Sequence, residues 1–145
     1  MVKNNITFLL YQKVRTTYIK EGIRHYMDKL KPYADVDILE PKDEKNYKTH
    51  LHKLEKETMT IVLDLKGRQF SSESFSKTWQ GLTSQKVKDV SFIIGGPYGV
   101  PQPIRSDLML SISNLTMNHE MVPLVVMEQV YRAYSIIQGL PYHHG

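Results

Sequence analysis

The chain has 145 residues, of which 41% are hydrophobic and 23% charged, and its 19 Lys and Arg residues outnumber its 15 Asp and Glu residues. This composition is typical of a single globular domain over residues 1–145 and excludes a disordered chain, and the net charge of +4 favours an anionic partner such as nucleic acid. The chain has no cysteine, which excludes disulfides and thiolate metal sites and is compatible with a reducing cytosol, so we expect a cytoplasmic protein. No apolar run approaches the roughly 20 residues of a membrane span, so we expect no membrane partner.

Short apolar runs and amphipathic segments alternate along the first half of the chain. Residues 6–10 are rich in β-formers and predict a buried strand. A helix is expected to follow, with Thr16 or Thr17 as its cap and Pro32 just beyond its end. The same patterns then predict a second strand over residues 35–40 and a charged loop over residues 41–46. An exposed polar helix over residues 47–57 and a third strand over residues 59–65 are expected to follow.

The second half of the chain continues this alternation. After a turn at residues 66–68, Ser71 or Ser72 is expected to cap a helix, and residues 90–94 predict a fourth strand. Strands that alternate with helices in this way indicate an α/β fold with a mostly parallel sheet. The remaining segments predict a short helix over residues 101–108 and a strand with a loop over residues 110–116. A long helix is expected over residues 121–138, with Gly139 as its end.

The fourth predicted strand runs directly into the sequence GGPYG at positions 95–99. Three glycines and a proline in five positions exclude regular structure and let the backbone approach a neighbour closely. A loop of this kind at the end of a strand is how open α/β sheets form a ligand crevice. The spacing matches neither G-x-G-x-x-G nor a P-loop, so a tight turn that binds nothing is the alternative.

The segment 121–138 carries apolar side chains almost all the way round its predicted helix. A helix of this kind must be buried on more than one side. In a chain this small we expect a second copy of the protein to cover one of these sides, which predicts a homodimer. The alternative is a central helix that the sheet and loops of its own chain enclose.

Three stretches follow one another in a specific order: FIIGGPYG at 92–99, LSISNLTMNHEMV at 110–122 and EQVYRAYSIIQGLPYHH at 128–144. In this order and spacing they resemble the large-subunit ribosomal RNA methyltransferase H family, whose members are small SPOUT methyltransferases. The resemblance implies an α/β fold with a C-terminal trefoil knot, a rare exception to the rule that chains are un-knotted. It also implies a homodimer that binds S-adenosyl-L-methionine and methylates N3 of a pseudouridine in the 23S rRNA of the assembled ribosome.

The family's functional positions are carried over through these motifs. Those suggested for chemistry or substrate handling are Arg132, Tyr142 and His143. Those suggested for binding the cofactor are Leu63, Gly96, Ser113, Asn114, Leu115, Thr116, Met117 and Asn118.

These residue types suit methyl transfer to an imide nitrogen. The transfer is an in-line displacement, so most of the catalysis consists of holding donor and acceptor in line. The acceptor N3 carries a proton, and histidine, the residue type at position 143, is a common general base. Arg132 stays charged and is suited to stabilising negative oxygens or to holding a phosphate. The structural alternatives are an ion pair between Arg132 and Glu128 at i,i+4 spacing and, for His143, an exposed tail.

The chain departs from the family pattern at Asn118, where proline is common, at Pro123, where a basic residue is common, and at His144, which replaces Arg or Lys. These departures leave open a non-catalytic ribosome- or RNA-binding module on the same fold. An enzyme that uses another nucleotide-like ligand is a further alternative. We expect no metal site, because His50, His52 and the two tail histidines have no acidic partner at ligand spacing.

Overall fold

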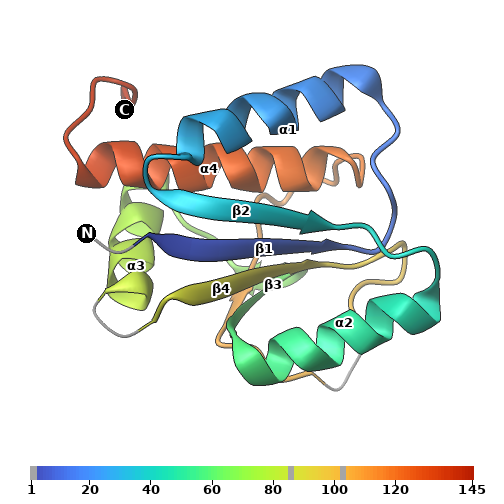
Figure 1. The fold of residues 1–145 in the computed structure, drawn as a ribbon. Coiled ribbons are helices and arrows are strands. Elements are labelled where there is room, and N and C mark those ends of the chain that lie inside the picture. The colour runs from blue at the N-terminus through green and yellow to red at the C-terminus, as the bar shows by residue number, and fades with distance from the viewer. Residues whose placement is uncertain (1–2, 85–86, 102–103) are drawn as a thin grey trace.

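The computed structural model describes residues 3–84, 87–101 and 104–145 and shows a parallel five-stranded sheet flanked by four helices (Figure 1). The expected α/β architecture is confirmed, and the sheet has the strand order β2-β1-β4-β3-β5. Within the described part of the chain, no helix combines the length and apolar character that crossing a bilayer requires. The strands are β1 Asn4–Leu10, β2 Ala34–Leu39, β3 Met59–Arg68, β4 Asp89–Ile94 and β5 Leu108–Leu110, and the helices are α1 Thr17–Leu30, α2 Glu44–Glu57, α3 Ser72–Thr83 and α4 Met121–Ile137.

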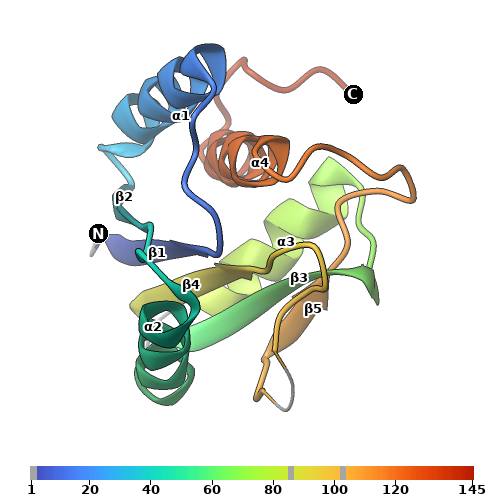
Figure 2. The same ribbon diagram turned by 90° about the vertical axis from the view of Figure 1, so that its right-hand side faces the viewer.

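Side chains along the central strands alternate between two cores, one on each face of the sheet. On β1, Phe8 packs on the side of α1, α3 and α4, whereas Leu9 packs on the side of α2 (Figure 2). Phe92 and Ile93 on β4 repeat this alternation. All four side chains are fully buried, as expected for a parallel sheet that is covered on both faces. On the first side, the rings of Phe92 and Trp79 stack with their centres 5.8 Å apart.

The short helix expected over residues 101–108 does not form in the described part of that segment, and Gln102 and Pro103 lie outside the described residues. Leu108–Leu110 is instead the strand β5, which pairs in parallel with β3. Asp107 fixes this pairing, because its carboxylate accepts a hydrogen bond from the backbone N–H of Thr60 at 2.8 Å while its own N–H donates to the Thr60 carbonyl at 2.8 Å. The free edge of β3 therefore decides the structure of this segment, and local sequence preference does not.

The turn expected at residues 66–68 is also wrong, because β3 continues to Arg68. The pairing of β3 with β5 shifts register between Leu63 and Arg68. A methyl group on Gly67 would lie 2.7 Å from the backbone carbon of Met109. Gly67 therefore lies inside a strand at a point where a neighbouring backbone passes close to it.

The helix α2 differs from its expectation in two respects. It begins at Glu44, inside the predicted charged loop, because the side chain of Asp43 accepts a hydrogen bond from Asn46 N and caps the helix. Its polar face is exposed as predicted, but Tyr47 is fully buried against the sheet. This tyrosine supports the glycine loop, as described below.

The last helix, α4, packs against both α1 and α3 within its own chain (Figure 1). Each of its described residues is buried or half-buried. Enclosure by its own chain, the alternative to a dimer, therefore accounts for much of its apolar surface. Half-buried Val122 and Val125 remain available to a partner, and the homodimer stays a prediction.

The start of α1 is tied to the start of α4 by Glu120. Its Oε1 accepts hydrogen bonds from the backbone N–H groups of Arg15 at 3.0 Å and Thr16 at 2.9 Å. Thr16 holds the cap position of α1 as expected, although its side chain makes no capping hydrogen bond. The hydrogen bond from Thr16 is the main reason that the pKa of Glu120 lies below its ordinary value, so this carboxylate stays ionised at neutral pH.

Candidate active site

A cleft of about 700 Å³ lies at the edge of the sheet where β1, β3, β4 and β5 end, the edge that faces the viewer in Figure 2. Parallel strands bring their carboxyl ends to one edge, so segments far apart in the sequence meet there. A volume of this size falls within the roughly 300–1,000 Å³ that small-molecule sites occupy. Six of the eight residues suggested for cofactor binding line the cleft, namely Leu63, Gly96, Ser113, Leu115, Thr116 and Met117.

The glycine loop forms one wall of this cleft. It closes on itself through a hydrogen bond from Gly99 N to the Gly96 carbonyl at 3.0 Å, and Gly99 has a φ of 82°, which favours glycine. A methyl group on Gly95 would lie 2.3 Å from the Gly99 carbonyl carbon, and one on Gly96 would lie 2.4 Å from the ring of Tyr11. At Gly95 the backbone leaves no room for a side chain, and at Gly96 a side chain would require the Tyr11 ring to move.

Two tyrosines support the loop from below. The buried hydroxyl of Tyr47 donates a hydrogen bond to the carbonyl of Ile94, the last residue of β4, at 3.1 Å. The backbone N–H of Tyr11 reaches the same carbonyl at 3.1 Å, and the two rings meet edge to face with their centres 5.1 Å apart. Burial raises the pKa of Tyr47, so its hydroxyl remains a donor. The helix α2 therefore fixes the point at which the strand turns into the loop.

The other two suggested cofactor residues, Asn114 and Asn118, are not among those that line the cleft. Asn114 Oδ1 accepts a hydrogen bond from Gln69 Nε2 at 2.7 Å, and Asn118 Oδ1 accepts one from Glu120 N at 2.9 Å. Both side chains thus stabilise the loop itself. The sequence interpretation also missed several lining residues, including Gln12, Tyr98, His119 and Val122. Gln12 follows the end of β1, and β1 pairs in parallel with β4, so Gln12 lies beside the glycine loop that follows β4. A prediction of this strand pairing could have found it.

A second group of polar side chains surrounds the far end of α4. Arg132 Nη2 donates to Glu128 Oε2 at 2.8 Å, which confirms the ion pair expected from their spacing. Arg132 Nη1 lies 2.9 Å from His143 Nδ1, and its guanidinium carbon lies 4.8 Å from the centre of the Tyr142 ring. The Tyr142 hydroxyl donates to the same Glu128 oxygen at 2.7 Å. The group, here named the tail cluster, comprises Tyr26, Glu73, Glu128, Arg132, Tyr142 and His143.

The charges in the tail cluster are well defined. The hydrogen bond to Glu128 raises the pKa of Arg132, so the guanidinium is permanently charged. Burial, with the hydrogen bonds to Glu128 and Tyr26, raises the pKa of Tyr142, which makes this phenol a hydrogen-bond donor at neutral pH and not a proton acceptor. The hydrogen bond with His143 lowers the pKa of Glu73, so that carboxylate is ionised.

The structure does not bring the tail cluster to the cleft of the same chain. Val122, near the start of α4, lines the cleft, whereas Arg132 lies further along the same helix. At 1.5 Å per residue, the helix rises about 15 Å between these two residues. In Figure 1 the chain after α4 lies beside the amino ends of the strands, whereas the start of α4 lies toward their carboxyl ends. Within one chain, the residues suggested for chemistry are therefore separated from those suggested for the cofactor.

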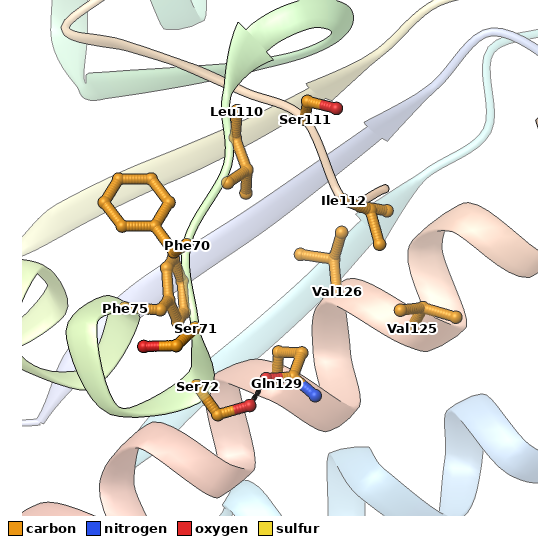
Figure 3. A pocket seen from close by; sticks show the side chains of 10 residues that line it. All are labelled: Phe70, Ser71, Ser72, Phe75, Leu110, Ser111, Ile112, Val125, Val126 and Gln129. Atoms are coloured by element: carbon orange, nitrogen blue, oxygen red, sulfur yellow. Dashed lines mark hydrogen bonds between the residues drawn. The ribbon is translucent and has the colours of Figure 1, made fainter. Parts of the chain in front are cut away.

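A smaller cavity of about 200 Å³ lies between the start of α3, the end of β5 and α4 (Figure 3). Its walls are largely apolar, and at its rim Ser72 Oγ donates a hydrogen bond to Gln129 Oε1 at 2.7 Å. Residues 110–112 line both this cavity and the larger cleft, so they form the wall between the two. The smaller cavity falls below the size range of small-molecule sites.

No group of three or more His, Asp or Glu side chains in residues 3–84, 87–101 and 104–145 is placed to hold a metal ion. Of the histidines considered for such a site, His52 lies 3.7 Å from Glu55 and His143 lies 3.1 Å from Glu73. Each of these histidines thus has one acidic neighbour.

The sequence that forms the cleft and the tail cluster is similar to known proteins. A family profile described as "Predicted SPOUT methyltransferase" matches residues 4–143, which is nearly the whole chain. The chain belongs to the SPOUT methyltransferase family. A protein from Desulforamulus reducens named "Ribosomal RNA large subunit methyltransferase H" is 38% identical over 95% of this chain and 98% of its own length. A protein of the same name from Halothermothrix orenii is 35% identical over 95% of this chain and 98% of its own length. Another from Streptococcus gordonii is 36% identical over 90% of this chain and 94% of its own length.

The chain is a methyltransferase, and its two polar regions differ in the chemistry that they offer. The cleft has the glycine loop, four residues with hydroxyl side chains (Tyr98, Ser111, Ser113 and Thr116) and apolar side chains, a lining that suits a nucleoside-like methyl donor. The tail cluster has a permanent cation, a histidine and a phenol that suit the handling of an acceptor base. The trefoil knot stays an implication of the family resemblance.

Proposed function

We propose that this protein is an S-adenosyl-L-methionine-dependent methyltransferase that methylates N3 of a pseudouridine in the 23S rRNA of the assembled ribosome. The proposal rests on one observation above the others: six residues from the family's cofactor positions converge on one cleft at the carboxyl edge of the sheet. The near full-length match to SPOUT methyltransferases and to proteins named for rRNA methylation supports the choice of reaction and substrate. The net charge of +4 suits an RNA partner, and a cytoplasmic location follows from the substrate.

S-Adenosylmethionine, when bound, supplies an activated methyl group on a sulfonium. The cleft would hold it with apolar contacts from Leu63, Leu115 and Met117 and with hydrogen bonds from the hydroxyl groups of Ser113 and Thr116. Gly96 would present its backbone to the ligand, while the Tyr11 ring packs where its side chain would otherwise lie. Asn114 and Asn118 would contribute by fixing the shape of the loop.

The tail cluster would handle the acceptor base. Arg132 would stabilise the negative charge that develops on the uracil oxygens when N3 loses its proton. His143 would accept that proton, provided that its Nδ1 is released from Arg132, which occupies it in this arrangement. Tyr142 would act as a donor only, because its pKa is raised.

The separation of the two regions favours a homodimer with shared sites. Methyl transfer requires the sulfonium and the acceptor to be in contact, whereas about 15 Å of helix separates Val122 from Arg132 within one chain. In a two-fold dimer, when the tail cluster of one protomer faces the cleft of its partner, the partner's tail cluster faces the first protomer's cleft in the same way. We infer that the tail cluster of one protomer completes the cleft of its partner.

A transfer experiment tests the proposed reaction. The protein would be incubated with methyl-labelled S-adenosylmethionine and ribosomes that lack the modification, and label would be located by digestion of the rRNA. We expect label on N3 of one pseudouridine in 23S rRNA. Ribosome binding without label would favour a non-catalytic RNA-binding module instead. Calorimetric titration supplies the second control, because an absence of heat up to millimolar S-adenosylmethionine would overturn the cofactor assignment.

A further inference from the structure

Both ring nitrogens of His143 are engaged by charged side chains from different helices. On one side, Nδ1 lies 2.9 Å from Arg132 Nη1, on α4. On the other side, Nε2 lies 3.1 Å from the carboxylate oxygen Oε2 of Glu73, in the first turn of α3. A guanidinium has donors and no acceptor, so Nδ1 must present its lone pair to Arg132. The ring proton of the neutral imidazole therefore lies on Nε2 and is donated to Glu73.

In the described part of the chain, Arg132 and Glu73 supply the hydrogen-bond partners of the two imidazole nitrogens. The segment after α4 has no helix or strand. Backbone hydrogen bonds from Gly139 and Leu140 hold its start, and side-chain contacts of Tyr142 and His143 hold the part that follows. Glu128 is already engaged, since its Oε2 accepts from both Arg132 and Tyr142. The side chain of His143 is only 17% exposed, whereas that of Glu73 is 51% exposed. Among the described residues, the titratable and charged groups that face the imidazole are Arg132 and, behind it, Glu128, Tyr142 and Tyr26. On the Nε2 side they are Glu73 and the nearby carboxylate of Gly145.

The chain also closes over the contact between His143 and Glu73. A methyl group on Gly145 would lie 2.9 Å from His143 Nε2 and 3.5 Å from Glu73 Oε2. Glu73 itself sits where a carboxylate is favoured, because the first turn of a helix exposes backbone N–H groups and the positive end of the helix dipole. The acceptor for the ring proton is therefore an ionised carboxylate held by the helix α3.

We propose that Glu73 is a positioning residue for methyl transfer, which holds His143 as the Nε2-protonated tautomer and directs its Nδ1 lone pair toward the place of the acceptor base. This inference rests on the proposed function. It assigns a role to a residue that lies 70 positions from His143 in the sequence and that none of the motifs contains.

The step that Glu73 supports can be written out. When Arg132 turns from Nδ1 to a uracil oxygen, Nδ1 becomes free, and the N–H bond of N3 breaks as an N–H bond forms at Nδ1. The lone pair of N3 then forms the new bond to the methyl carbon, while the carbon–sulfur bond breaks and its electron pair remains on the neutral thioether. The imidazolium that results donates to Glu73, whose negative charge stabilises it, as a carboxylate does beside a catalytic histidine.

The test compares Glu73→Ala with Glu73→Gln, since the glutamine amide oxygen still accepts from Nε2 but carries no charge. Glu44→Gln is the matched control, because Glu44 also lies in the first turn of a helix and has no hydrogen-bonded or ion-pair partner in the described structure. Nitrogen-15 NMR would report the tautomer of His143, which a His143→Gln variant assigns among the six histidines. Steady-state kinetics would follow methyl transfer to ribosomes for the same proteins.

Arg132 at Nδ1 favours the Nε2-protonated tautomer by itself, so the tautomer is compared in an Arg132→Met background, which removes that donor. In this background we expect the Nε2-protonated tautomer with Glu73 and with Glu73→Gln, and a mixture of both tautomers with Glu73→Ala. We expect kcat to fall about tenfold or more in both variants, with KM for S-adenosylmethionine nearly unchanged, since only the proton-transfer contribution is affected. Glu44→Gln should match the wild-type protein in both readouts. An unchanged tautomer on adding Glu73→Ala to Arg132→Met would overturn the proposal, and so would an unchanged kcat when Glu73→Ala is the single substitution. A wild-type protein that transfers no methyl group would overturn the proposed function, and the tautomer would still show whether Glu73 orients His143.

Discussion

Replacing Arg132 with alanine is expected to lower kcat for methyl transfer by about a hundredfold to a thousandfold, the usual effect of removing a donor that stabilises transition-state charge. Arg132 holds Glu128 at 2.8 Å and His143 at 2.9 Å, so its loss also releases the tail. Single-turnover kinetics on ribosomes that lack the modification would measure the effect. S-Adenosylmethionine binding should change little, because the contacts that hold the cofactor belong to the cleft.

Two further variants sharpen this prediction. Arg132→Lys should recover little activity, because an ammonium is a point charge and does not reproduce the two-sided contact of a guanidinium. Arg105→Ala is the matched control, since Arg105 also makes an ion pair, with Asp107 at 2.9 Å, but contacts neither the cleft nor the tail cluster. Activity of Arg132→Ala within a few-fold of the control would show that Arg132 is only a structural ion-pair partner.

Gly95→Ala is expected to lower kcat/KM for S-adenosylmethionine about a hundredfold, because a displacement of about 1 Å in a site has effects of this size. The added methyl group would lie 2.3 Å from the carbonyl carbon of Gly99 and 2.6 Å from the backbone nitrogen of Val100. Backbone atoms cannot move aside as the end of a flexible side chain can, so the loop must open. Calorimetry with the cofactor and kinetics with ribosomes would measure the loss.

Two other glycines provide graded controls for this effect. Gly96→Ala should be milder, since its methyl group would meet the side-chain ring of Tyr11 at 2.4 Å, and that ring is able to rotate. Gly81→Ala places a methyl group in open space on α3 and should stabilise the protein by about 0.5–1 kcal/mol relative to glycine, without a change in activity. Equal cofactor affinity in Gly95→Ala and Gly81→Ala would contradict the role of the glycine loop.

The sequence was sufficient for the elements whose structure local pattern decides. The strand residues 90–94 and the glycine loop after them lie where the apolar run and the three glycines predict, and the ion pair of Arg132 with Glu128 follows from helical spacing. The sequence was insufficient where a distant strand edge decides. Residues 108–110 form a strand because β3 offers a free edge, and Gly67 lies within β3 because β5 passes close to it.

In the candidate site, too, some residues could be placed from the sequence and others could not. The gathering of six of the eight suggested cofactor residues could be predicted, because they follow the ends of parallel strands or belong to one loop. The partners in the tail cluster could not, since Glu73 and Tyr26 approach the tail only through the packing of α1, α3 and α4. The distance between tail cluster and cleft could not be predicted either, because a motif gives the order of residues and not which end of a helix faces the ligand.

Mixed dimers test the central claim, that one site takes its cleft from one protomer and its tail cluster from the other. Gly95→Ala and Arg132→Ala proteins, each nearly inactive alone, would be mixed after partial unfolding and refolded together, and methyl transfer to ribosomes would be measured. In a two-fold dimer, half of the mixed population is heterodimer with one undamaged site, so we expect about a quarter of wild-type activity. Activity that stays at the level of the separate variants, with heterodimers shown to be present, would contradict the shared site and place the whole reaction within one chain.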